Sequence, residues 1–332
     1  MKALLSKASG PSHTLVLEEV DVPVPGAGQV RLRVHACGLG LPDTLIIEDR
    51  YQMKPPRPFA PGGEVAGVVD AVGEGVTGLA VGDRVLGWCF WGGLAEQLVI
   101  DADRCVPVPG TMPMDEAAAL LLTYGTAHYA LRERGQLQAG DTVLVTGAAG
   151  GVGLAAIELA RAWGARVVAA ASSQDKLDFA LAHGASAGVV YPAGAMDKDA
   201  ARAFAQSLKE AVGGAGANVV LDVVGGDVAE ACLRAMAWQG RFLVVGFAGG
   251  VPRLPLNLVL LKGCQVVGVS WGGFIERERA RLDASVRELL DMHTRGLIRP
   301  RITQRFALAR GADALELIAG RQAQGKLVVT MV

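Results

Sequence analysis

The feature that most constrains this chain is an apolar, β-branched run that ends in a glycine-rich turn and continues as a helical pattern. Residues 143–146 read Val-Leu-Val-Thr, residues 147–153 read Gly-Ala-Ala-Gly-Gly-Val-Gly, and the helical pattern extends from Leu154 to Trp163. A strand, a small-residue turn and a helix N-terminus with free N–H groups together form a pyrophosphate site. Gly150 would let the main chain approach the anion, and Gly153 would let the helix pack closely on the strand. This unit therefore predicts dinucleotide binding.

The chain changes character near Met114. Before it, apolar and polar residues alternate, as at Val30, Leu32 and Val34, which indicates β-structure. After it, helical and strand patterns alternate, which predicts an α/β fold with a doubly wound parallel sheet. We expect helices at Asp115–Leu131 and Gln174–His183, strands at Ala165–Ala171, Ala187–Tyr191, Asn218–Val224, Arg241–Phe247 and Cys264–Val269, and an irregular excursion at Ala248–Pro255. Segments Glu276–Arg295 and Ile302–Val332 are expected to return to the first domain, with a terminal strand at Leu327–Val329.

Length and charge exclude several classes of protein. A chain of 332 residues predicts two domains, and a net charge of −1 argues against nucleic acid as a partner. No apolar run reaches the ~18–20 residues of a membrane span, and no signal-peptide core follows Met1, so we expect a cytoplasmic protein that acts on small molecules. The cysteines are scattered without a Cys-x-x-Cys spacing, which argues against a disulfide framework. His35 and Cys37 are expected to be structural, with a metal pair as the alternative.

Serine and lysine residues follow the second strand of the predicted nucleotide-binding unit. NAD enzymes commonly carry an acidic residue there to bind the ribose hydroxyls. Here Ser172 and Ser173 occupy that place and Lys176 follows, which favours a 2′-phosphate and hence NADPH. A serine that caps the next helix is the structural alternative, and Asp175 would bind the ribose of NADH after a small loop shift.

Along its whole length the chain resembles the zinc-independent NADPH:quinone oxidoreductases of the medium-chain dehydrogenase/reductase superfamily. The motifs that carry the resemblance are Pro61–Gly67, Gly82–Val85, Ala148–Gly153, Asp222–Gly226, Ser270–Phe274 and Gly325–Val329. The resemblance implies a GroES-like β-barrel catalytic domain formed by residues 1–120 and 268–332. It also implies a Rossmann NADPH-binding domain at residues 121–267 and a catalytic cleft between the two.

The resemblance also implies which residues bind the cofactor. It places near the phosphates or the nicotinamide Thr126, Ala149, Gly150, Gly151 and Val152, with Gly153 in the same loop. Around the 2′-phosphate it places Ser172, Ser173, Lys176 and Tyr191, the last of which is otherwise an aromatic residue packed at a strand end. On the nicotinamide side of the cleft it places Phe247, Ala248, Ser270 and Lys326.

The residues that bind zinc in related dehydrogenases are absent from the matching positions. Gly40 stands where the first cysteine would be, Gly63 where the histidine would be, and no cysteine occurs near Ala118. A zinc site needs three or four converging ligands, so we expect a metal-free protein that does not oxidise ordinary alcohols.

The expected reaction is hydride transfer from NADPH to an acceptor that is already electrophilic, either a quinone or an enone. Candidate residues on the acceptor side are Asp43, Tyr51 and Trp88. Tyr51 either donates a proton or lines the pocket, and Asp43 is either catalytic or a helix N-cap. The absence of a convincing general acid mildly favours quinone reduction, because solvent can protonate a hydroquinone.

Two other functions remain open from the sequence. An enoyl-CoA or enone reductase would use Arg50, Lys54 and Arg57 to bind a phosphorylated tail, although such residues are commonly a solvated rim. A crystallin-like NADPH-binding protein would show little turnover. The resemblance also suggests a homodimer in which strand Cys264–Ser270 pairs across a two-fold axis.

Overall fold

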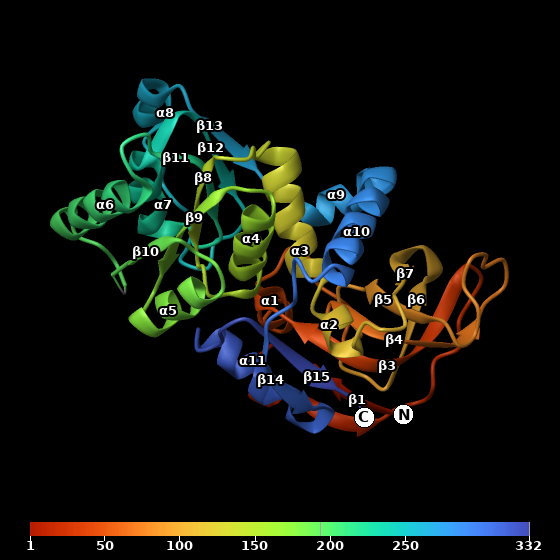
Figure 1. Ribbon diagram of the computed structural model, residues 1–332. Helices are drawn as coiled ribbons and strands as arrows, with labels where there is room; N and C mark the ends of the chain where they lie inside the picture. Colours follow the sequence, from red (N-terminus) through yellow and green to blue (C-terminus); the bar gives the residue numbers. More distant parts are fainter. Residues whose placement is uncertain (193, 332) are drawn as a thin grey trace. The chain divides into compact units, whose positions relative to one another are not determined.

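The computed structural model describes residues 1–192 and 194–331, and the chain divides into two compact units. Met1–Leu122 and Pro300–Val332 form the first unit, and Thr123–Arg299 form the second (Figure 1). The first division lies close to the expected residue 120, whereas the second lies beyond the expected residue 268.

The difference at the second division comes from helices α9 (Trp271–Arg277) and α10 (Arg279–Thr294). Phe274 of α9 stacks on Tyr129 with ring centroids 4.2 Å apart, and Ser285 and Glu288 of α10 contact both ring nitrogens of His128. These aromatic and polar contacts hold α9 and α10 in the second unit. The segment Glu276–Arg295, which we expected in the first domain, therefore lies in the second unit.

The first unit is a GroES-like domain whose strands are antiparallel except for the parallel pair β14 and β15. Its elements are β1 (Lys2–Leu5), β2 (Val16–Glu19), β3 (Gln29–Leu39), α1 (Leu41–Ile47), β4 (Glu64–Val72), β5 (Arg84–Trp88), β6 (Gln97–Asp101), β7 (Cys105–Pro107), α2 (Met114–Ala118), β14 (Ile302–Ala307), α11 (Gly311–Ala319) and β15 (Lys326–Thr330). The main sheet has the order β14-β15-β3-β4-β5-β7, and β6 pairs with β3. The predicted terminal strand is thus confirmed as β15, beside β3.

Strand β3 brings the ends of its neighbours together. Gly38 pairs with Glu64 at the start of β4, and Leu39 pairs with Leu327 near the start of β15. Register shifts between Arg31 and Leu32 and again between Val34 and Ala36 let β3 bend along its length. The polar side chains at the starts of β4 and β15 therefore meet over the end of β3.

The second unit is a Rossmann-type α/β domain. Its elements are α3 (Leu121–His128), a π-helical turn (Tyr129–Arg134), β8 (Thr142–Thr146), α4 (Gly151–Ala162), β9 (Arg166–Ala171), α5 (Gln174–Ala182), β10 (Ala187–Val190), α6 (Lys198–Val212), β11 (Ala217–Asp222), α7 (Gly226–Arg234), β12 (Met236–Val244), α8 (Leu256–Lys262), β13 (Gln265–Gly268), α9 and α10. Its sheet has the order β10-β9-β8-β11-β12-β13, and each neighbouring pair is parallel. Figure 1 shows α4 on one side of these strands and α6 and α7 on the other, which confirms the doubly wound fold.

One expected helix differs from the structure. The Ala/Leu-rich segment Asp115–Leu131 is divided among α2, α3 and the π-helical turn rather than forming one helix. The irregular stretch expected at Ala248–Pro255 is confirmed, and a short helix, α8, which the sequence analysis did not identify, follows it directly.

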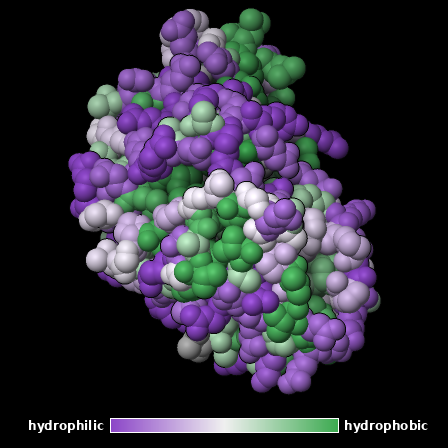
Figure 2. Space-filling model, turned by 90° about the vertical axis from the view of Figure 1, so that its right-hand side faces the viewer, coloured by the Kyte–Doolittle hydropathy of each residue, from purple (hydrophilic) through white to green (hydrophobic). Residues whose placement is uncertain are grey.

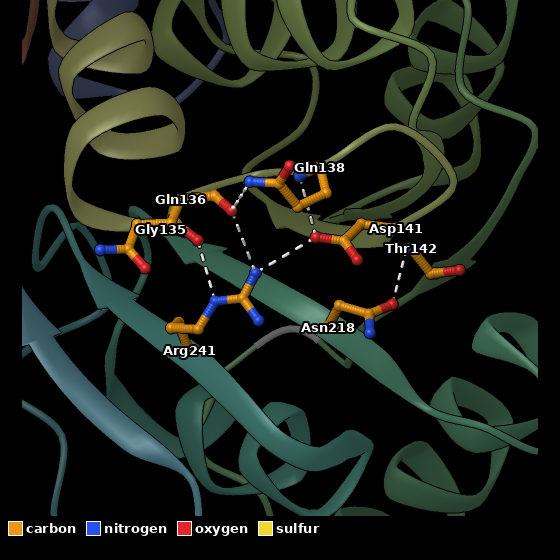
Figure 3. Close-up of polar contacts among 7 residues, drawn as sticks. All are labelled: Gly135, Gln136, Gln138, Asp141, Thr142, Asn218 and Arg241. Atoms are coloured by element: carbon orange, nitrogen blue, oxygen red, sulfur yellow. Dashed lines mark hydrogen bonds and ion pairs between the residues drawn. The ribbon is translucent and has the colours of Figure 1, made fainter.

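A polar network holds the edge of the sheet where β8 and β11 begin and where Arg241 of β12 lies beside them (Figure 3). The Arg241 guanidinium donates to the carbonyls of Gly135 at 2.8 Å and Gln136 at 3.5 Å, and it pairs with the Asp141 carboxylate at 3.1 Å. The Thr142 amide donates to Asn218 Oδ1 at 2.8 Å. This network fixes where β8 starts, at the edge opposite the glycine-rich turn. Within the described ranges, no helix is both long and apolar enough to span a membrane.

Candidate functional site

The glycine-rich turn connects the end of β8 to the start of α4. Gly147 has a φ of +58°, which favours glycine, and its carbonyl accepts a hydrogen bond from the Gly150 amide at 2.9 Å. Gly150 is the N-cap of α4 and supplies no side chain to the helix end. A Cβ on Gly153 would lie 2.4 Å from the Gly147 carbonyl oxygen and 2.8 Å from the Ala148 Cα. Gly153 thus lets α4 pack against the turn itself, and the N-terminal amides of α4 can face an anion.

A second group of predicted residues follows β9. Ser173 is the N-cap of α5, and its hydroxyl accepts a hydrogen bond from the Lys176 amide at 3.4 Å. The Lys176 ammonium lies 3.4 Å from the Ser172 hydroxyl, so hydroxyl and positive charge gather at the end of the strand. The Tyr191 amide donates to the Ala171 carbonyl at 2.9 Å, which places Tyr191 beside that end. Its ring packs edge-on against Phe204, so the packing interpretation of Tyr191 is also satisfied.

The remaining candidates of this unit follow other strands or lie on a helix. Phe247 comes after β12 and is half exposed, and the Ala248 amide donates to the Val223 carbonyl at 3.3 Å. Ser270 comes after β13 and caps α9 by accepting from the Gly273 amide. Thr126 lies on α3 and is half-buried.

The parallel sheet places most of these candidates at one edge. The turns and loops after β8, β9, β10, β12 and β13 all leave the carboxyl ends of parallel strands. In open α/β sheets, ligands bind outside the carboxyl ends of the strands. Because β9 and β11 flank β8, the glycine-rich turn stands near the middle of that edge.

The sequence analysis did not identify the polar pair behind the glycine-rich turn. The Thr146 hydroxyl donates to Asp222 Oδ1 at 2.6 Å, and both residues are fully buried. Burial raises the pKa of Asp222, although the hydrogen bonds from Thr146, Gly225 and Val224 oppose that shift. Asp222 belonged to a recognised motif, but its local sequence does not indicate a partner on β8.

A buried polar cluster occupies the first unit. Lys326 and Glu64 form an ion pair, and Glu64 Oε2 also accepts a hydrogen bond from the Leu122 amide at 2.9 Å. The side chains are only 5% and 2% exposed. Gly38 lies against the pair, because a Cβ there would approach Glu64 Oε1 to 2.8 Å and Lys326 Cε to 3.0 Å. The Lys326 ammonium, predicted near the nicotinamide, is thus engaged by Glu64.

Asp43 is buried beside this cluster and holds two loops. Its carboxylate accepts from the Gly40 amide at 2.8 Å and from the Gly62 amide at 3.2 Å. Asp43 is the third residue of α1 and caps the helix from there, so the N-cap alternative is wrong in its position, since Gly40 is the N-cap. Burial raises the pKa of Asp43 to about 6, with the backbone hydrogen bond from Gly40 and the Lys326 charge acting against it.

Tyr51 and the nearby basic residues differ in their surroundings. Tyr51 is half-buried against the core of the first unit, and burial raises the pKa of its phenol, which therefore stays protonated near neutral pH. Arg50 pairs with Glu48 at 3.0 Å, and Arg57 pairs with Asp49 at 2.9 Å. Two of the three basic residues considered for a phosphorylated tail thus already have acidic partners. Trp88, at the end of β5, is buried.

The positions that bind zinc in related dehydrogenases have other surroundings here. Gly40 lies near Lys326, since a Cβ there would be 4.0 Å from the ammonium nitrogen, and Gly63 lies against Phe90. Among residues 1–192 and 194–331, no three His, Cys, Asp or Glu side chains are grouped to hold a metal ion.

Comparison with known proteins gives two family matches. Residues 26–110 match the alcohol dehydrogenase GroES-like domain, and residues 151–289 match the zinc-binding dehydrogenase family.

Individual relatives match nearly the whole chain. Quinone oxidoreductase-like protein 2 of Rattus norvegicus is 39% identical over 96% of this chain and 89% of its own length. Quinone oxidoreductase of Sus scrofa is 31% identical over 98% of this chain and 96% of its own length. A solved quinone oxidoreductase of Thermus thermophilus, described together with its NADPH complex, is 33% identical with a TM-score of 0.82, and the match covers 100% of each chain.

Proposed function

The chain belongs to the quinone oxidoreductase family of the medium-chain dehydrogenase/reductase superfamily, and from this premise we propose that it transfers a hydride from NADPH to quinones or related electrophilic carbonyl compounds without zinc. The observation that carries the proposal is the carboxyl edge of the Rossmann sheet. There the glycine-rich turn and the Ser172–Lys176 group supply main-chain amides, hydroxyls and one ammonium.

The group after β9 fits a 2′-phosphate. The Lys176 ammonium and the Ser172 hydroxyl are 3.4 Å apart, so one phosphate oxygen can accept from both. Asp175 is exposed in the first turn of α5, where the helix dipole favours a carboxylate. NADPH is therefore the proposed cofactor, and it would supply the hydride when bound. The chain's own residues bind and orient it.

Zinc-free catalysis is supported by the first unit. Glycine occupies positions 40 and 63, and Ala118 directs its carbonyl toward Gly38. Without a metal to polarise a carbonyl, the acceptor must be intrinsically electrophilic. Lys326 and Asp43 do not replace a metal ligand set, because Lys326 pairs with Glu64 and Asp43 holds two backbone amides.

A proton donor on the acceptor side is a separate part of the proposal. Tyr51 carries a protonated phenol and is only half-buried, so of the two candidate residues it is better suited to touch an acceptor. Asp43 is buried and is proposed to position the loops that begin at Gly40 and Gly62. A quinone needs no enzymatic donor, since solvent protonates the reduced product, whereas an enone would benefit from Tyr51.

The proposed assembly is a homodimer. Strand β13 is the edge of the Rossmann sheet, with Val266 41% exposed, and α8 beside it exposes Leu256, Leu260 and Leu261 by 68–80%. Figure 2 shows a hydrophobic cluster at the top of the view, at the height where Figure 1 places α8. A second copy that continues the sheet at β13 would cover this surface. In analytical ultracentrifugation the wild type should sediment as a dimer, and Leu260→Glu should shift it toward monomer. A wild type that sediments as a monomer would contradict the proposed dimer.

The test of the reaction is steady-state turnover of NADPH with 1,4-benzoquinone, 9,10-phenanthrenequinone and crotonyl-CoA. We expect the quinones to be reduced faster, partly because Arg50 and Arg57 are engaged by acidic partners. Faster turnover of the thioester would favour the enoyl-CoA reductase alternative. Tight NADPH binding without turnover of any acceptor would favour a crystallin-like binding protein.

The test of the cofactor is the ratio of NADPH to NADH affinity. Lys176→Ala should weaken NADPH binding about tenfold or more and leave NADH binding nearly unchanged, since one charge-assisted phosphate contact is lost. Lys209→Ala, which removes an exposed lysine on α6, is the matched control. An unchanged NADPH preference in Lys176→Ala would contradict the proposed phosphate site.

A further inference from the structure

Thr146 and Asp222 extend the pairing of β8 with β11 beyond the main-chain ladder. The last paired residues of the two strands are Val145 and Leu221. At the next position the Thr146 hydroxyl donates to Asp222 Oδ1 at 2.6 Å and accepts from the Val223 amide at 3.0 Å. Because both side chains are buried, these bonds are protected from competition with water.

Asp222 also shapes the turn that follows β11. Its carboxylate accepts from the Val224 amide at 3.0 Å and from the Gly225 amide at 3.0 and 3.2 Å. Gly225 and Gly226 adopt φ values of +70° and +53°, so the main chain turns sharply at this point. The carboxylate therefore holds residues 223–225 at a defined place relative to the end of β8.

Gly147 packs against the side chains of this turn. A Cβ on Gly147 would lie 2.6 Å from Val223 Cγ2 and 3.3 Å from Val224 Cγ2. The Gly147 carbonyl in turn accepts from the Gly150 amide and lies against Gly153, where α4 begins. A continuous series of contacts thus runs from the Thr146–Asp222 pair through Val223 and Gly147 to the N-terminus of α4.

We propose that Thr146 and Asp222 are positioning residues that hold the glycine-rich turn in the conformation that binds the dinucleotide pyrophosphate. The inference rests on the proposed function and adds to it, since neither side chain is placed against the cofactor. Loss of the pair would move the amides of the turn relative to the anion. It would leave the Ser172–Lys176 group unchanged, because that group follows β9 and not β8 or β11.

The test compares dinucleotide affinity in three variants by fluorescence titration. We expect Thr146→Val to raise the Kd for NADPH and for NADH by the same factor, about tenfold, which corresponds to ~1.4 kcal/mol. Thr146→Ser keeps the hydroxyl and should stay within about twofold of the wild type. Asp222→Asn keeps the shape of the side chain, weakens the acceptor, and should raise both Kd values as Thr146→Val does.

A matched control separates positioning from general stability. Asn218 accepts from the Thr142 amide at the other end of the same β8–β11 pair, where both strands begin (Figure 3). Asn218→Ala should lower the urea midpoint without changing either Kd. Hydrogen exchange of residues 147–153 should accelerate in Thr146→Val and not in Asn218→Ala, and this readout applies to folded protein even where a variant is less stable.

The outcomes distinguish the two levels of the proposal. If the wild type binds NADPH and Thr146→Val binds it equally well, the positioning role is overturned and the proposed function stands. If Asn218→Ala and Thr146→Val weaken binding equally, the effect is general stability and the inference is overturned. A wild type that binds neither dinucleotide would overturn the proposed function, and the positioning role with it.

Discussion

Replacement of Lys326 by methionine should destabilise the first unit strongly. The change keeps the length of the side chain but leaves the Glu64 carboxylate buried without its cationic partner. The two side chains are 5% and 2% exposed, so water cannot take over the role of the ammonium. Breaking a buried ion pair on one side typically costs about 3–5 kcal/mol. We expect the free energy of unfolding of this unit to fall by that amount.

The double variant Lys326→Met/Glu64→Gln should recover much of this loss. It removes both charges, and a glutamine at position 64 can still accept the hydrogen bond from the Leu122 amide. We therefore expect a coupling energy of about 2–4 kcal/mol between the two substitutions. Arg310 and Asp313 provide the control, since this pair of the same unit is 2.7 Å apart but 69% and 49% exposed. Arg310→Met should cost less than about 1 kcal/mol.

Urea unfolding followed by circular dichroism measures the stability of each variant. Hydrogen exchange of peptides from β3 and β15 assigns the effect to the first unit, because a chain of two units need not unfold in one step. The reasoning is refuted if Lys326→Met costs no more than Arg310→Met. It is also refuted if the double variant is less stable than both single variants, since removal of both charges would then bring no relief.

Three further predictions follow from single positions. Gly153→Ala should lower the free energy of unfolding by about 1–3 kcal/mol and weaken NADPH binding, because its Cβ would clash with backbone atoms. The control, Gly272→Ala, has open space around the new Cβ in a helix and should raise the free energy of unfolding by up to ~1 kcal/mol. Equal effects of the two substitutions in urea unfolding would contradict this. The pKa of Asp43, about 6, is above that of an unfolded carboxyl, because the folded protein favours the protonated form. The stabilising contribution of this carboxyl group is therefore complete below about pH 4 and is lost as the pH rises through 6. Melting curves from pH 4 to 7 should therefore show the stability of the wild type falling relative to Asp43→Asn, and parallel curves would exclude this role. Arg241→Met removes the donor to the Gly135 carbonyl and the cationic partner of Asp141, whereas the Gln136 carbonyl and Asp141 keep their hydrogen bonds from Gln138. The substitution should cost about 1–3 kcal/mol without changing NADPH affinity, which titration and urea unfolding can check together.

Local patterns predicted most strands of the second unit to within a few residues. The alternation of apolar segments and glycine stops depends on neighbouring residues, so it can be recognised without a partner element. The long helix expected at Asp115–Leu131 was wrong because helix propensity says nothing about tertiary contact. In the structure the Ala118 carbonyl at the end of α2 lies against Gly38 of β3, where a Cβ would approach it to 2.1 Å.

The candidate site was predicted in the same uneven way. The turn from Gly147 to Gly153 was recognisable because its glycines are required by close backbone contacts within a few residues of one another. The sequence did not indicate that α9 and α10 belong to the second unit. Their place depends on contacts of His128 with Ser285 and Glu288, which are far away from it in the chain.

The amino-acid sequence by itself determined that a strand, a glycine turn and a helix follow one another and that Ser172, Ser173 and Lys176 come after the next strand. Local sterics and hydrogen-bonding capacity are enough for such features. The tertiary structure alone decided that Thr146 meets Asp222 and that Lys326 meets Glu64. Their side chains are paired because folding buries them together, where an unpaired polar group would be costly, and no local pattern encodes which distant residue will be the partner.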